Sequence, residues 1–375
     1  MKIVFVLPSL GAGGAERTVV NLVKYLTKSA SLNITVLTLI KSPDFYELDP
    51  KVDRVRMDFT GRSGSIFEII SRMLKVRKAI RSLKPDWVVS FMTPVNTFVL
   101  ISLVFSSINV IVSERNNPKE QLSKFQLFYS CWVYHFMAYK LIVQTYGVLN
   151  IYNRIVALSK IIVIPNAITK TTKYWKGGSK NPKFQIIAVG RLHYQKGYDI
   201  LINIFAHSDF CRKFCMLKIY GEGEQESSLE YLIIDLKMSE CIKLMGGSNY
   251  IDDQLIRADL FVSSSRYEGF PNVLLEALSL GVPTVAMDCD FGPSEIIEHE
   301  YSGLLVPINE SNHLGEAIHI LLENEELKKS ISKNAIKSTE KYFPEKIMPL
   351  WIDLFDKSNG TKKQYLKYSA NSKSC

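Results

Sequence analysis

Two glutamates in the second half of the sequence have a spacing that suits the binding of a phosphorylated sugar. Glu268 follows a short apolar run and a cluster of serines, and Glu276 lies eight residues later in an apolar helix that we predict at 272–280. An ionised carboxylate in such apolar surroundings needs a partner. The start of a helix offers backbone N–H groups and the positive end of its dipole, which favour an anion. We therefore expect a phosphate above the loop and sugar hydroxyls within reach of Glu276.

A purely structural interpretation of the same stretch stays open. Glu276 would then pair with a buried arginine, and Glu268 would be a solvated residue of the loop. The local sequence does not separate the two interpretations, because structural ion pairs perturb carboxylates as active sites do. In the binding interpretation, the loop and first-turn residues around the anion are Gly269, Phe270, Asn272, Val273 and Leu274. Pro271 would occupy the first turn of the helix.

A second loop carries the positive charge that a diphosphate needs. It follows an apolar strand that we predict at 184–189, and it is bounded by Gly190 and Gly197. Arg191 and Lys196 leave the same strand end, so both could reach one diphosphate, the arginine as a fork and the lysine as a point charge. The alternative of two surface cations stays open, although the glutamate loop favours a shared diphosphate.

These motifs resemble those of a known family. The segment Glu268-Gly-Phe-Pro-Asn-Val-Leu-Leu-Glu276 is similar to the Glu-x7-Glu signature of retaining GT-B glycosyltransferases of the family 4 type. Gly190-Arg191-Leu…Lys196-Gly197 resembles the diphosphate-binding loop of that family. Further matches are Gly13-Gly-Ala-Glu-Arg17, which resembles its first glycine loop, and Gly292-Pro-Ser-Glu295, which resembles a subset that builds bacterial surface polysaccharides. The resemblance covers almost the whole chain and implies nucleotide-sugar transfer without specifying the sugar.

The resemblance implies a role for each matching residue. Glu276 would hold the ribose hydroxyls of a UDP-sugar, and Glu268 would contact the donor sugar through its 3-hydroxyl. Arg191 and Lys196 would neutralise the diphosphate as charge grows on the leaving group, and losing one such contact would cost about 3 kcal/mol. Gly221 follows a predicted strand and would form the turn on the nucleotide side. The family pattern further implies retention of configuration at the anomeric carbon, with no metal and no other cofactor.

Glycines also follow the first apolar strand, which we predict at 3–7. The resemblance places the backbone of Gly13 and Gly14 beside the donor diphosphate and the acceptor. A tight strand-to-helix turn explains these glycines on steric grounds alone. A dinucleotide site is disfavoured, because Glu16 occupies the position of the last glycine in that fingerprint.

Polar residues cluster where another predicted strand ends, at position 113. Ligands bind at the carboxyl ends of strands in open α/β sheets, so the cluster is a site signal. Many members of the family carry a histidine near here that contacts the donor sugar, and this chain has none. Glu114 and Arg115 are the candidate substitutes, and they would line the acceptor side of the cleft together with Gly13 and Gly14.

Strands and helices alternate in both halves of the chain, which predicts two βαβ domains. We expect an α/β GT-B fold, in which two Rossmann-like domains face a central cleft. The acceptor-binding domain would span 1–168, a linker 169–183, and the nucleotide-sugar domain 184–342. Residues 343–375 would form a helix that returns to the first domain, followed by a basic tail.

The composition fits this size and class. The chain has 375 residues, of which 47% are hydrophobic, enough for two domains of about 150–200 residues. Its six cysteines form no Cys-x-x-Cys pair, which indicates reduced thiols in a cytosolic protein. The first residues predict a core strand rather than a signal peptide. The net charge is +9, but no zinc-finger or RNA-recognition motif accompanies it, so we expect no nucleic-acid partner.

Two stretches suit contact with an anionic membrane surface. A helix predicted at 66–83 presents five cations, and residues 125–139 hold seven aromatic side chains. For the first stretch we favour a sheet-covering helix with a charged solvent face, and packing on the sheet explains part of the second. The uncharged stretch at 97–113 is too short to span a bilayer. We expect a peripheral protein at the cytoplasmic face of a bacterial membrane, with a saccharide on a polyprenyl diphosphate as acceptor.

Other function classes remain as alternatives. Nucleotide-sugar 2-epimerases share this fold and bind the same donor without an acceptor, but they differ in their catalytic carboxylates. A non-catalytic module that binds a nucleotide or a saccharide is a third hypothesis, which the intact motifs disfavour. Hydrolysis is disfavoured because its two acids flank the scissile bond. Asp288 and Asp290 fit the Asp-x-Asp metal clamp of another glycosyltransferase fold, but Arg191 and Lys196 already supply positive charge, and we interpret the pair as a loop cap.

Overall fold

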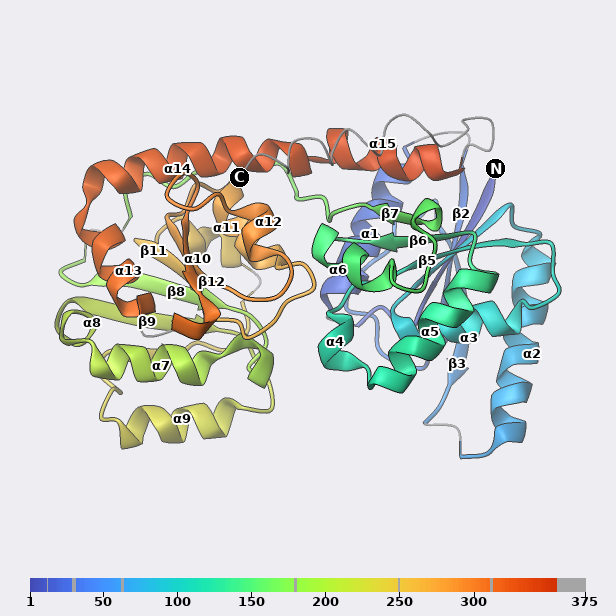
Figure 1. Cartoon of the computed structure of the whole chain (residues 1–375), viewed down its shortest axis with the longest axis horizontal. Helices are drawn as coiled ribbons and strands as arrows, with labels where there is room; N and C mark the ends of the chain where they lie inside the picture. The colour runs from blue at the N-terminus through green and yellow to red at the C-terminus, as the bar shows by residue number, and fades with distance from the viewer. Residues whose placement is uncertain are drawn as a thin grey trace. The chain divides into compact units, whose positions relative to one another are not determined.

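The computed structural model describes residues 1–11, 13–28, 32–61, 64–178, 181–248, 250–310 and 313–355. The described chain forms two compact units (Figure 1). The first unit comprises Met1–Ala167 together with the segment that begins at Pro344, and the second is Ile168–Phe343. The predicted basic tail, after residue 355, lies outside the described residues.

The first unit is built on a seven-stranded sheet in which neighbouring strands run parallel, in the order β3-β2-β1-β4-β5-β6-β7. The strands are β1 (Lys2–Leu7), β2 (Asn33–Ile40), β3 (Asp53–Phe59), β4 (Trp87–Phe91), β5 (Asn109–Ser113), β6 (Lys140–Val143) and β7 (Ile161–Val163). Central strands such as β1 and β4 are continuous apolar runs because helices cover both of their faces.

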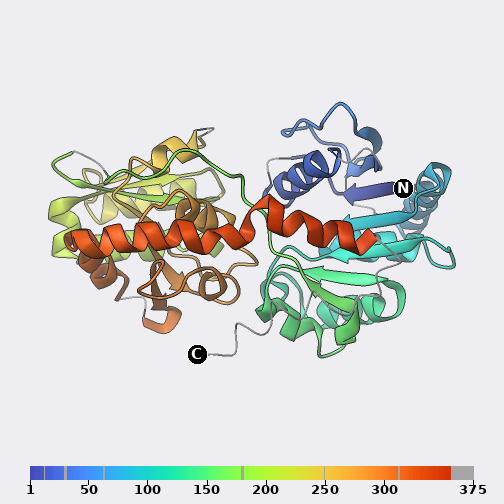
Figure 2. The ribbon, with the colours of Figure 1, turned by 90° about the horizontal axis from the view of Figure 1, so that it is seen from above.

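Helices cover both faces of this sheet. They are α1 (Gly14–Leu26), α2 (Ile66–Leu83), α3 (Thr93–Ser102), α4 (Pro118–Gln121), α5 (Lys124–Met137), α6 (Tyr146–Tyr152) and α15 (Pro344–Phe355), with a 3₁₀ turn at Leu158–Lys160. Right-handed crossovers place α1 on one face and α2, α3 and α5 on the other. Helix α15 lies alongside α1 (Figure 2) and shares its hydrophobic core.

The second unit repeats this architecture with six parallel strands in the order β10-β9-β8-β11-β12-β13. They are β8 (Phe184–Val189), β9 (Cys215–Tyr220), β10 (Ile242–Leu244), β11 (Leu260–Ser263), β12 (Thr284–Asp288) and β13 (Leu304–Pro307). The helices are α7 (Tyr198–His207), α8 (Asp209–Phe214), α9 (Glu226–Asp235), α10 (Ile251–Leu255), α11 (Asn272–Ser279), α12 (Pro293–Ile296), α13 (His313–Glu323) and α14 (Glu325–Thr339), with 3₁₀ turns at Tyr194–Lys196, Ile308–Glu310 and Glu340–Tyr342.

Alternate residues of the second sheet belong to two separate cores. Ile186 and Ala188 of β8 pack in one core with α7, α9 and α13, and Ile187 packs in the other with α10, α11 and α14. Two cores on opposite faces are what a doubly wound parallel sheet requires. The two α/β sheets that the sequence predicts are therefore present.

The segment predicted as a linker packs on the second unit. Residues 169–183, which we expect to join the domains, group with this unit. The reason is Trp175, whose backbone N–H donates to the carbonyl of Leu280 at 2.8 Å and whose indole N–H donates to that of Ala258 at 2.8 Å. An aromatic side chain with both donors satisfied fixes this segment to the unit beneath it.

Two of the edge strands, β3 and β13, are not predicted from the sequence. Strand β3 lies at the edge of the first sheet, and it alternates half-buried and exposed residues rather than forming an apolar run. Strand β13 is the corresponding edge of the second sheet. No helix within the described ranges has the length and apolar composition needed to cross a bilayer.

Helix α15 completes the core of the first unit. The ring of Trp351 lies 6.2 Å from that of Phe91 on β4, and the indole N–H of Trp87 donates to the carbonyl of Phe355 at 3.2 Å. The buried residues of this helix are Ile347, Met348, Trp351, Leu354 and Phe355. The stability of the first unit therefore depends on a segment far along the chain.

Replacing Trp351 with alanine should lower the free energy of unfolding by about 3–5 kcal/mol, because it leaves a large cavity against the sheet. Urea unfolding followed by circular dichroism measures the loss. Ile352→Ala is the matched control, since Ile352 lies on the same helix and is 40% exposed; its effect should stay within about 0.5 kcal/mol. Equal unfolding midpoints for Trp351→Ala and the wild type would contradict this role of α15.

Candidate functional site

The loops that follow β8, β9 and β11 meet at the carboxyl edge of the second sheet, where ligands bind in open α/β folds. Gly190 ends β8 and Gly221 ends β9. Gly221 has a φ of +146°, and a Cβ at this position would lie 1.9 Å from the carbonyl oxygen of Gly190. Only glycine therefore allows these two loops to approach so closely.

A second close approach joins the β8 loop to the β11 loop. Gly197 has a φ of +63°, and a Cβ there would lie 2.2 Å from the carbonyl oxygen of Ser264. The hydroxyl of Ser264 donates to the carbonyl of Lys196 at 2.9 Å, and the N–H of Arg266 donates to that of Gln195 at 2.8 Å. These contacts hold Lys196 beside the glutamate loop.

Lys196 and Glu268 form an ion pair at the centre of this edge. Lys196 Nζ lies 2.6 Å from Glu268 Oε1, which also accepts from the hydroxyl of Ser265 at 2.7 Å. The second oxygen, Oε2, accepts from the amide of Gln195 at 3.3 Å. Glu268 is only 5% exposed. The interpretation of Glu268 as a solvated loop residue is therefore wrong, and its carboxylate is held in a fixed position.

Arg191 differs from Lys196 in its surroundings. Its side chain is exposed and forms no hydrogen bond or ion pair with any residue that the structure describes. The guanidinium is thus available to a ligand at the end of β8. That both cations reach one diphosphate stays a prediction.

Helix α11 begins directly above this ion pair. Its first residue is Asn272, and Pro271 takes the cap position, one residue earlier than predicted. A small cavity at its start is lined by Lys196, Glu268, Val273 and Leu274, among others. Four of the residues predicted to bind the donor therefore share one cavity at a helix N-terminus.

The remaining donor-site predictions lie around this helix. Gly269 is buried in the loop, and the buried ring of Phe270 packs edge-on against Tyr342 with centroids 5.9 Å apart. Phe270 is therefore a core residue as well as a loop residue. Glu276 lies in the second turn of α11 and is half-buried. Its contact with a ribose stays a prediction.

Arg266 in the loop after β11 contacts the loop after β8 and the start of α7, and the sequence did not reveal these contacts. Its guanidinium reaches Asp199 at the start of α7 through two contacts of 2.5 and 2.7 Å, and it lies 4.0 Å from the ring centroid of Tyr194. Burial alone would raise the pKa of Asp199, but hydrogen bonds and charge from Arg266 outweigh burial and lower this pKa. No local pattern signals a pair 67 residues apart in sequence.

The loop after β12 supports the site through its backbone. The carbonyl of Asp290 accepts from the N–H of Glu268 at 3.3 Å, and burial raises the pKa of the neighbouring Cys289 thiol. No group of three or more histidine, cysteine, aspartate or glutamate residues arranged for a metal ion occurs in the part of the chain described. The interpretation of Asp288 and Asp290 as a loop cap stays a prediction.

In the first unit, the predicted glycines lie at the start of α1. Gly13 caps this helix and Gly14 is its first residue. A Cβ on Gly13 would lie 1.9 Å from Oε2 of Glu16, so a side chain there would require Glu16 to move. Because the end of the Glu16 side chain can move, the turn itself does not require glycine, and contact of Gly13 and Gly14 with an acceptor stays a prediction.

Glu114 is buried in a polar cluster of the first unit. One oxygen accepts from Tyr134 at 2.5 Å and from Asn96 at 2.8 Å, and the other accepts from Thr93 at 2.7 Å. Burial raises the pKa of Glu114, and these hydrogen bonds oppose that rise. Because both of its oxygens are already engaged, the arrangement counts against Glu114 as a substitute for a ligand-binding histidine.

Arg115 is buried beside aromatic rings. Its guanidinium lies 5.2 Å from the ring of Phe91 and 5.6 Å from that of Trp351, and Nη1 donates to Asn166 at 2.6 Å. Burial lowers the pKa of Arg115 to about 9. Nε and Nη2 have no hydrogen-bond partner among the described residues. Arg115 therefore supports the core under α15, and its role beside an acceptor stays a prediction.

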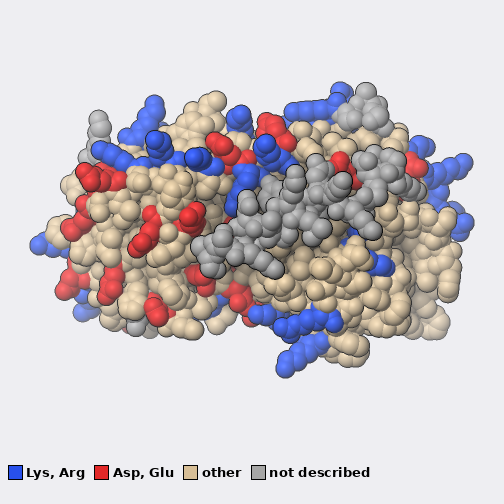
Figure 3. Space-filling model, turned by 45° about the horizontal axis from the view of Figure 1, so that its top comes forward, with Lys and Arg blue, Asp and Glu red and all other residues tan. Residues whose placement is uncertain are grey.

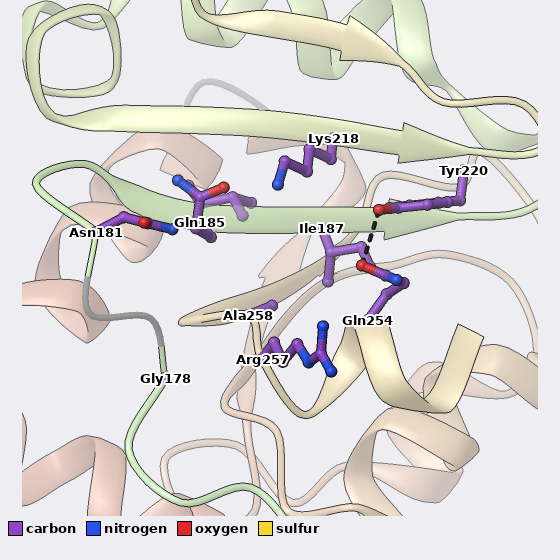
Figure 4. A pocket seen from close by; sticks show the side chains of 10 residues that line it. Gly178, Asn181, Gln185, Ile187, Lys218, Tyr220, Gln254, Arg257 and Ala258 are labelled. Atoms are coloured by element: carbon purple, nitrogen blue, oxygen red, sulfur yellow. Dashed lines mark hydrogen bonds between the residues drawn. The ribbon is translucent and has the colours of Figure 1, made fainter. Parts of the chain in front are cut away.

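A separate hollow of about 390 Å³ lies on the second unit (Figure 4). Gln185 and Lys218 line it from β8 and β9, and Gln254 and Arg257 line it from α10 and the residues after it. The hydroxyl of Tyr220 donates to Gln254 at 3.1 Å across one end. Neither Lys196 nor Glu268 lines this hollow, so it is distinct from the ion-paired edge.

Two family models match the chain. Residues 169–338 match the model described as glycosyl transferases group 1, and residues 12–171 match the model described as glycosyltransferase family 4. Together these matches span both units. The segments that carry the ion pair and helix α11 fall within the first of them.

Relatives of the chain include transferases of bacterial saccharide synthesis. An N-acetylgalactosaminyltransferase of Campylobacter jejuni, whose name gives an acceptor linked by diphosphate to undecaprenol, is 24% identical over 358 residues, covering 94% of this chain and 98% of its own. An exopolysaccharide phosphotransferase of Streptomyces coelicolor is 36% identical over 200 residues, which are 53% of this chain. The matched region is 21% of that longer protein.

Solved structures share the fold. The Anabaena protein HepE, crystallised with UDP and glucose, superposes with a TM-score of 0.79 at 19% identity, covering 94% of this chain and 99% of its own. Because the two structures match over almost the full length of both chains, the similarity includes both of the sheets described above.

Removal of either partner should reveal the coupling between Lys196 and Glu268. Lys196→Met should lower the free energy of unfolding by about 1–3 kcal/mol, because a buried carboxylate loses its charged donor. In the double variant Lys196→Met/Glu268→Gln, the total loss should be smaller than the sum of the two single losses, as measured by urea unfolding. Lys329→Met, on the exposed side of α14, is the control and should change little. Additive losses would contradict the coupling.

Glu114 should make stability depend on pH. Burial raises the folded-state pKa of Glu114 above its ordinary value of 4.5, so above that pH the unfolded chain releases this proton first and ionisation favours unfolding. The free energy of unfolding of the wild type should therefore fall, relative to that of Glu114→Gln, as pH rises from about 4.5 toward neutrality. Urea titrations of both proteins across this range measure the difference. The raised pKa would be contradicted if the free energy of unfolding of the wild type, relative to that of Glu114→Gln, stayed constant or increased over this pH range.

Proposed function

This chain belongs to the family 4 glycosyltransferases of the GT-B fold, and on that premise we propose that it transfers a hexose or N-acetylhexosamine from a UDP-sugar to a lipid-linked saccharide. The product would enter a bacterial O-antigen, capsule or exopolysaccharide. The observation that carries the proposal is the contact of Lys196 with Glu268 beside the start of α11. Cation, carboxylate and helix N-terminus there are the three groups that a sugar diphosphate needs.

Each group has a task in this proposal. The hydroxyl oxygen of the acceptor bonds to the anomeric carbon of the donor, the bond from that carbon to the diphosphate breaks, and the proton leaves with UDP. Arg191 and Lys196 stabilise the charge that grows on the diphosphate, where electrostatic stabilisation is most effective. Glu268 accepts a hydrogen bond from the donor sugar, and Glu276 accepts from the ribose. The transfer retains the anomeric configuration and uses no metal.

The acceptor is proposed as a saccharide on a polyprenyl diphosphate. Support comes from the Campylobacter relative, whose name specifies such an acceptor and which matches almost the full length of the chain. Support for UDP as the nucleotide comes from the fold shared with a protein crystallised with UDP. An acceptor held in a membrane requires the enzyme to work at the membrane surface, so we place it as a peripheral protein at the inner face of the cytoplasmic membrane.

Release of UDP from a panel of UDP-sugars, with and without lipid-linked saccharides, tests the proposal. Lys196→Ala and Glu276→Ala should each slow acceptor-dependent release by about 100-fold, because each removes a contact to the donor. Lys329→Ala and Glu316→Ala change exposed residues of the same types on α14 and α13 and should leave the rate unchanged. Release that needs no acceptor and yields an epimerised sugar would instead identify an epimerase. Tight UDP binding without turnover of any donor would indicate a binding module.

A further inference from the structure

Helices α2 and α5 and the loop after α3 expose apolar side chains on the outward surface of the first unit, and we infer that this surface docks the protein on an anionic lipid bilayer. The inference rests on the proposed function for its purpose, since a lipid-linked acceptor lies in such a bilayer. Its physical basis is independent of the reaction. Helices that cover a sheet normally turn their apolar face inward and leave a polar face to solvent.

Helix α5 turns an aromatic stripe outward. Phe125, Phe128, Tyr129, Trp132 and Phe136 recur at helical spacing and are all exposed, from 41% for Tyr129 to 77% for Phe125. The rings of Trp132 and Phe136 contact each other, with centroids 5.0 Å apart. The opposite side of the helix packs inward through other residues, including Cys131 and Tyr134. Core packing therefore does not account for the stripe.

Helix α2 turns a second apolar stripe outward. Ile66, Phe67, Ile70 and Leu74 are exposed, and Phe67 reaches 80%. Only Val76 and Ile80 of this helix are buried. A hollow of about 360 Å³ along the stripe is bordered by Lys75 and Lys78. The charged solvent face that the sequence favours is therefore only part of this surface, because four of the nine large apolar residues of the helix are also exposed.

Phe105, in the loop after α3, extends the apolar surface. It is 98% exposed and adopts the left-handed conformation, with a φ of +57°, which is unusual for an aromatic residue. The guanidinium of Arg77 on α2 donates to the carbonyls of Ser102 and Val104, at 3.1 and 2.6 Å, and ties this loop to α2. The ring is thus held out from the surface by a fixed turn.

The three elements form one face. Helix α3 packs against both α2 and α5, and all three cover the same side of the sheet (Figure 1). Packed helices lie about 8–10 Å apart, so the axes of α2 and α5 are roughly 16–20 Å from each other. Helix α5, with 14 residues, is about 21 Å long. The exposed aromatic and aliphatic side chains are therefore spread over a broad, gently curved area rather than a single spot.

The net charges of the two units indicate which kind of surface this face binds. Residues 1–167 contain 21 lysines and arginines against 10 aspartates and glutamates, a net charge of +11, whereas residues 168–343 contain 19 against 24, a net charge of −5. Figure 3 shows acidic side chains gathered on the surface of the second unit and few on the first. Helices α3 and α5 contain no acidic residue. The first unit is thus complementary to an anionic surface.

A bilayer fits this face better than a second copy of the chain. A two-fold dimer would bring the same patch, with its own Lys75 and Lys78, against itself, and like charges would oppose each other. Tryptophan and tyrosine with flanking lysines are instead typical of side chains at the boundary between headgroups and acyl chains. We therefore assign the occupant as a lipid surface that contains anionic headgroups.

Vesicle binding by the full chain tests the assignment. The wild type should bind vesicles of phosphatidylcholine with phosphatidylglycerol, and bind less at high salt or to phosphatidylcholine alone. The variants Trp132→Ser/Phe136→Ser and Phe67→Ser/Leu74→Ser should each bind at least about tenfold more weakly, since each removes two apolar anchors. Tyr231→Ser/Ile234→Ser is the matched control, because these residues on α9 are 71% and 67% exposed in the second unit. Binding of the α2 and α5 variants that equals the wild type would overturn the assignment.

A charge series separates electrostatic from apolar contributions. Lys75→Glu/Lys78→Glu should abolish the preference for phosphatidylglycerol, whereas Lys329→Glu/Lys333→Glu, exposed lysines of α14, should keep it. Light scattering of the same proteins without lipid tests the rival occupant. A wild-type dimer that the α5 substitutions convert to a monomer would identify the face as a contact between copies and overturn the bilayer assignment.

The docking surface and the reaction can fail separately. With a short-chain, water-soluble acceptor analogue, Trp132→Ser/Phe136→Ser should release UDP at the wild-type rate, because these residues belong to the first unit and the donor loops belong to the second. With acceptor embedded in vesicles, the same variant should lose at least about tenfold in rate. Vesicle binding without any UDP release would leave docking intact and remove the proposed function. UDP release without vesicle binding would leave the proposed function intact and remove the docking assignment.

Discussion

The ion pair between Lys196 and Glu268 is the interaction on which the loop edge of the second unit depends. A carboxylate that is almost fully buried is stable only with a charged or hydrogen-bonding partner, and Lys196, Ser265 and Gln195 supply three donors. The pair joins loops that lie 72 residues apart, and the close backbone approaches at Gly197 and Gly221 leave no room for a side chain at either glycine. The same geometry holds a cation and a carboxylate at the start of α11, where we propose that the sugar diphosphate binds.

The two units differ in net charge and in the side chains that they expose. In the first unit, Glu114 accepts hydrogen bonds from residues of α3 and α5, Arg115 lies against Trp351 of α15, and exposed apolar side chains lie on α2 and α5. The division suits an enzyme whose donor is a soluble nucleotide sugar and whose acceptor is held in a membrane. A basic unit with exposed aromatic rings can remain at a lipid surface without a spanning helix.

Much of the fold could be predicted from the sequence, because buried parallel strands are continuous apolar runs. Strand β8 and helix α2 have the predicted bounds, 184–189 and 66–83. Residues that pair across the sheet could not be predicted. Neither the contact of Lys196 with Glu268 nor that of Arg266 with Asp199 has a local signal, since both follow from β8 lying next to β11. The pattern of α5 gives an apolar stripe, but only the packed structure shows which stripe faces solvent.

A crystal structure of the protein with bound UDP is the most direct test of the account, whose central claim is that the Lys196–Glu268 edge is the nucleotide site. The account predicts the diphosphate at the start of α11, with phosphate oxygens within hydrogen-bond distance of Lys196 Nζ and of the Arg191 guanidinium, and with the ribose beside Glu276. Density for UDP in another place, such as the hollow lined by Lys218 and Arg257, with the Lys196–Glu268 pair unchanged, would contradict it.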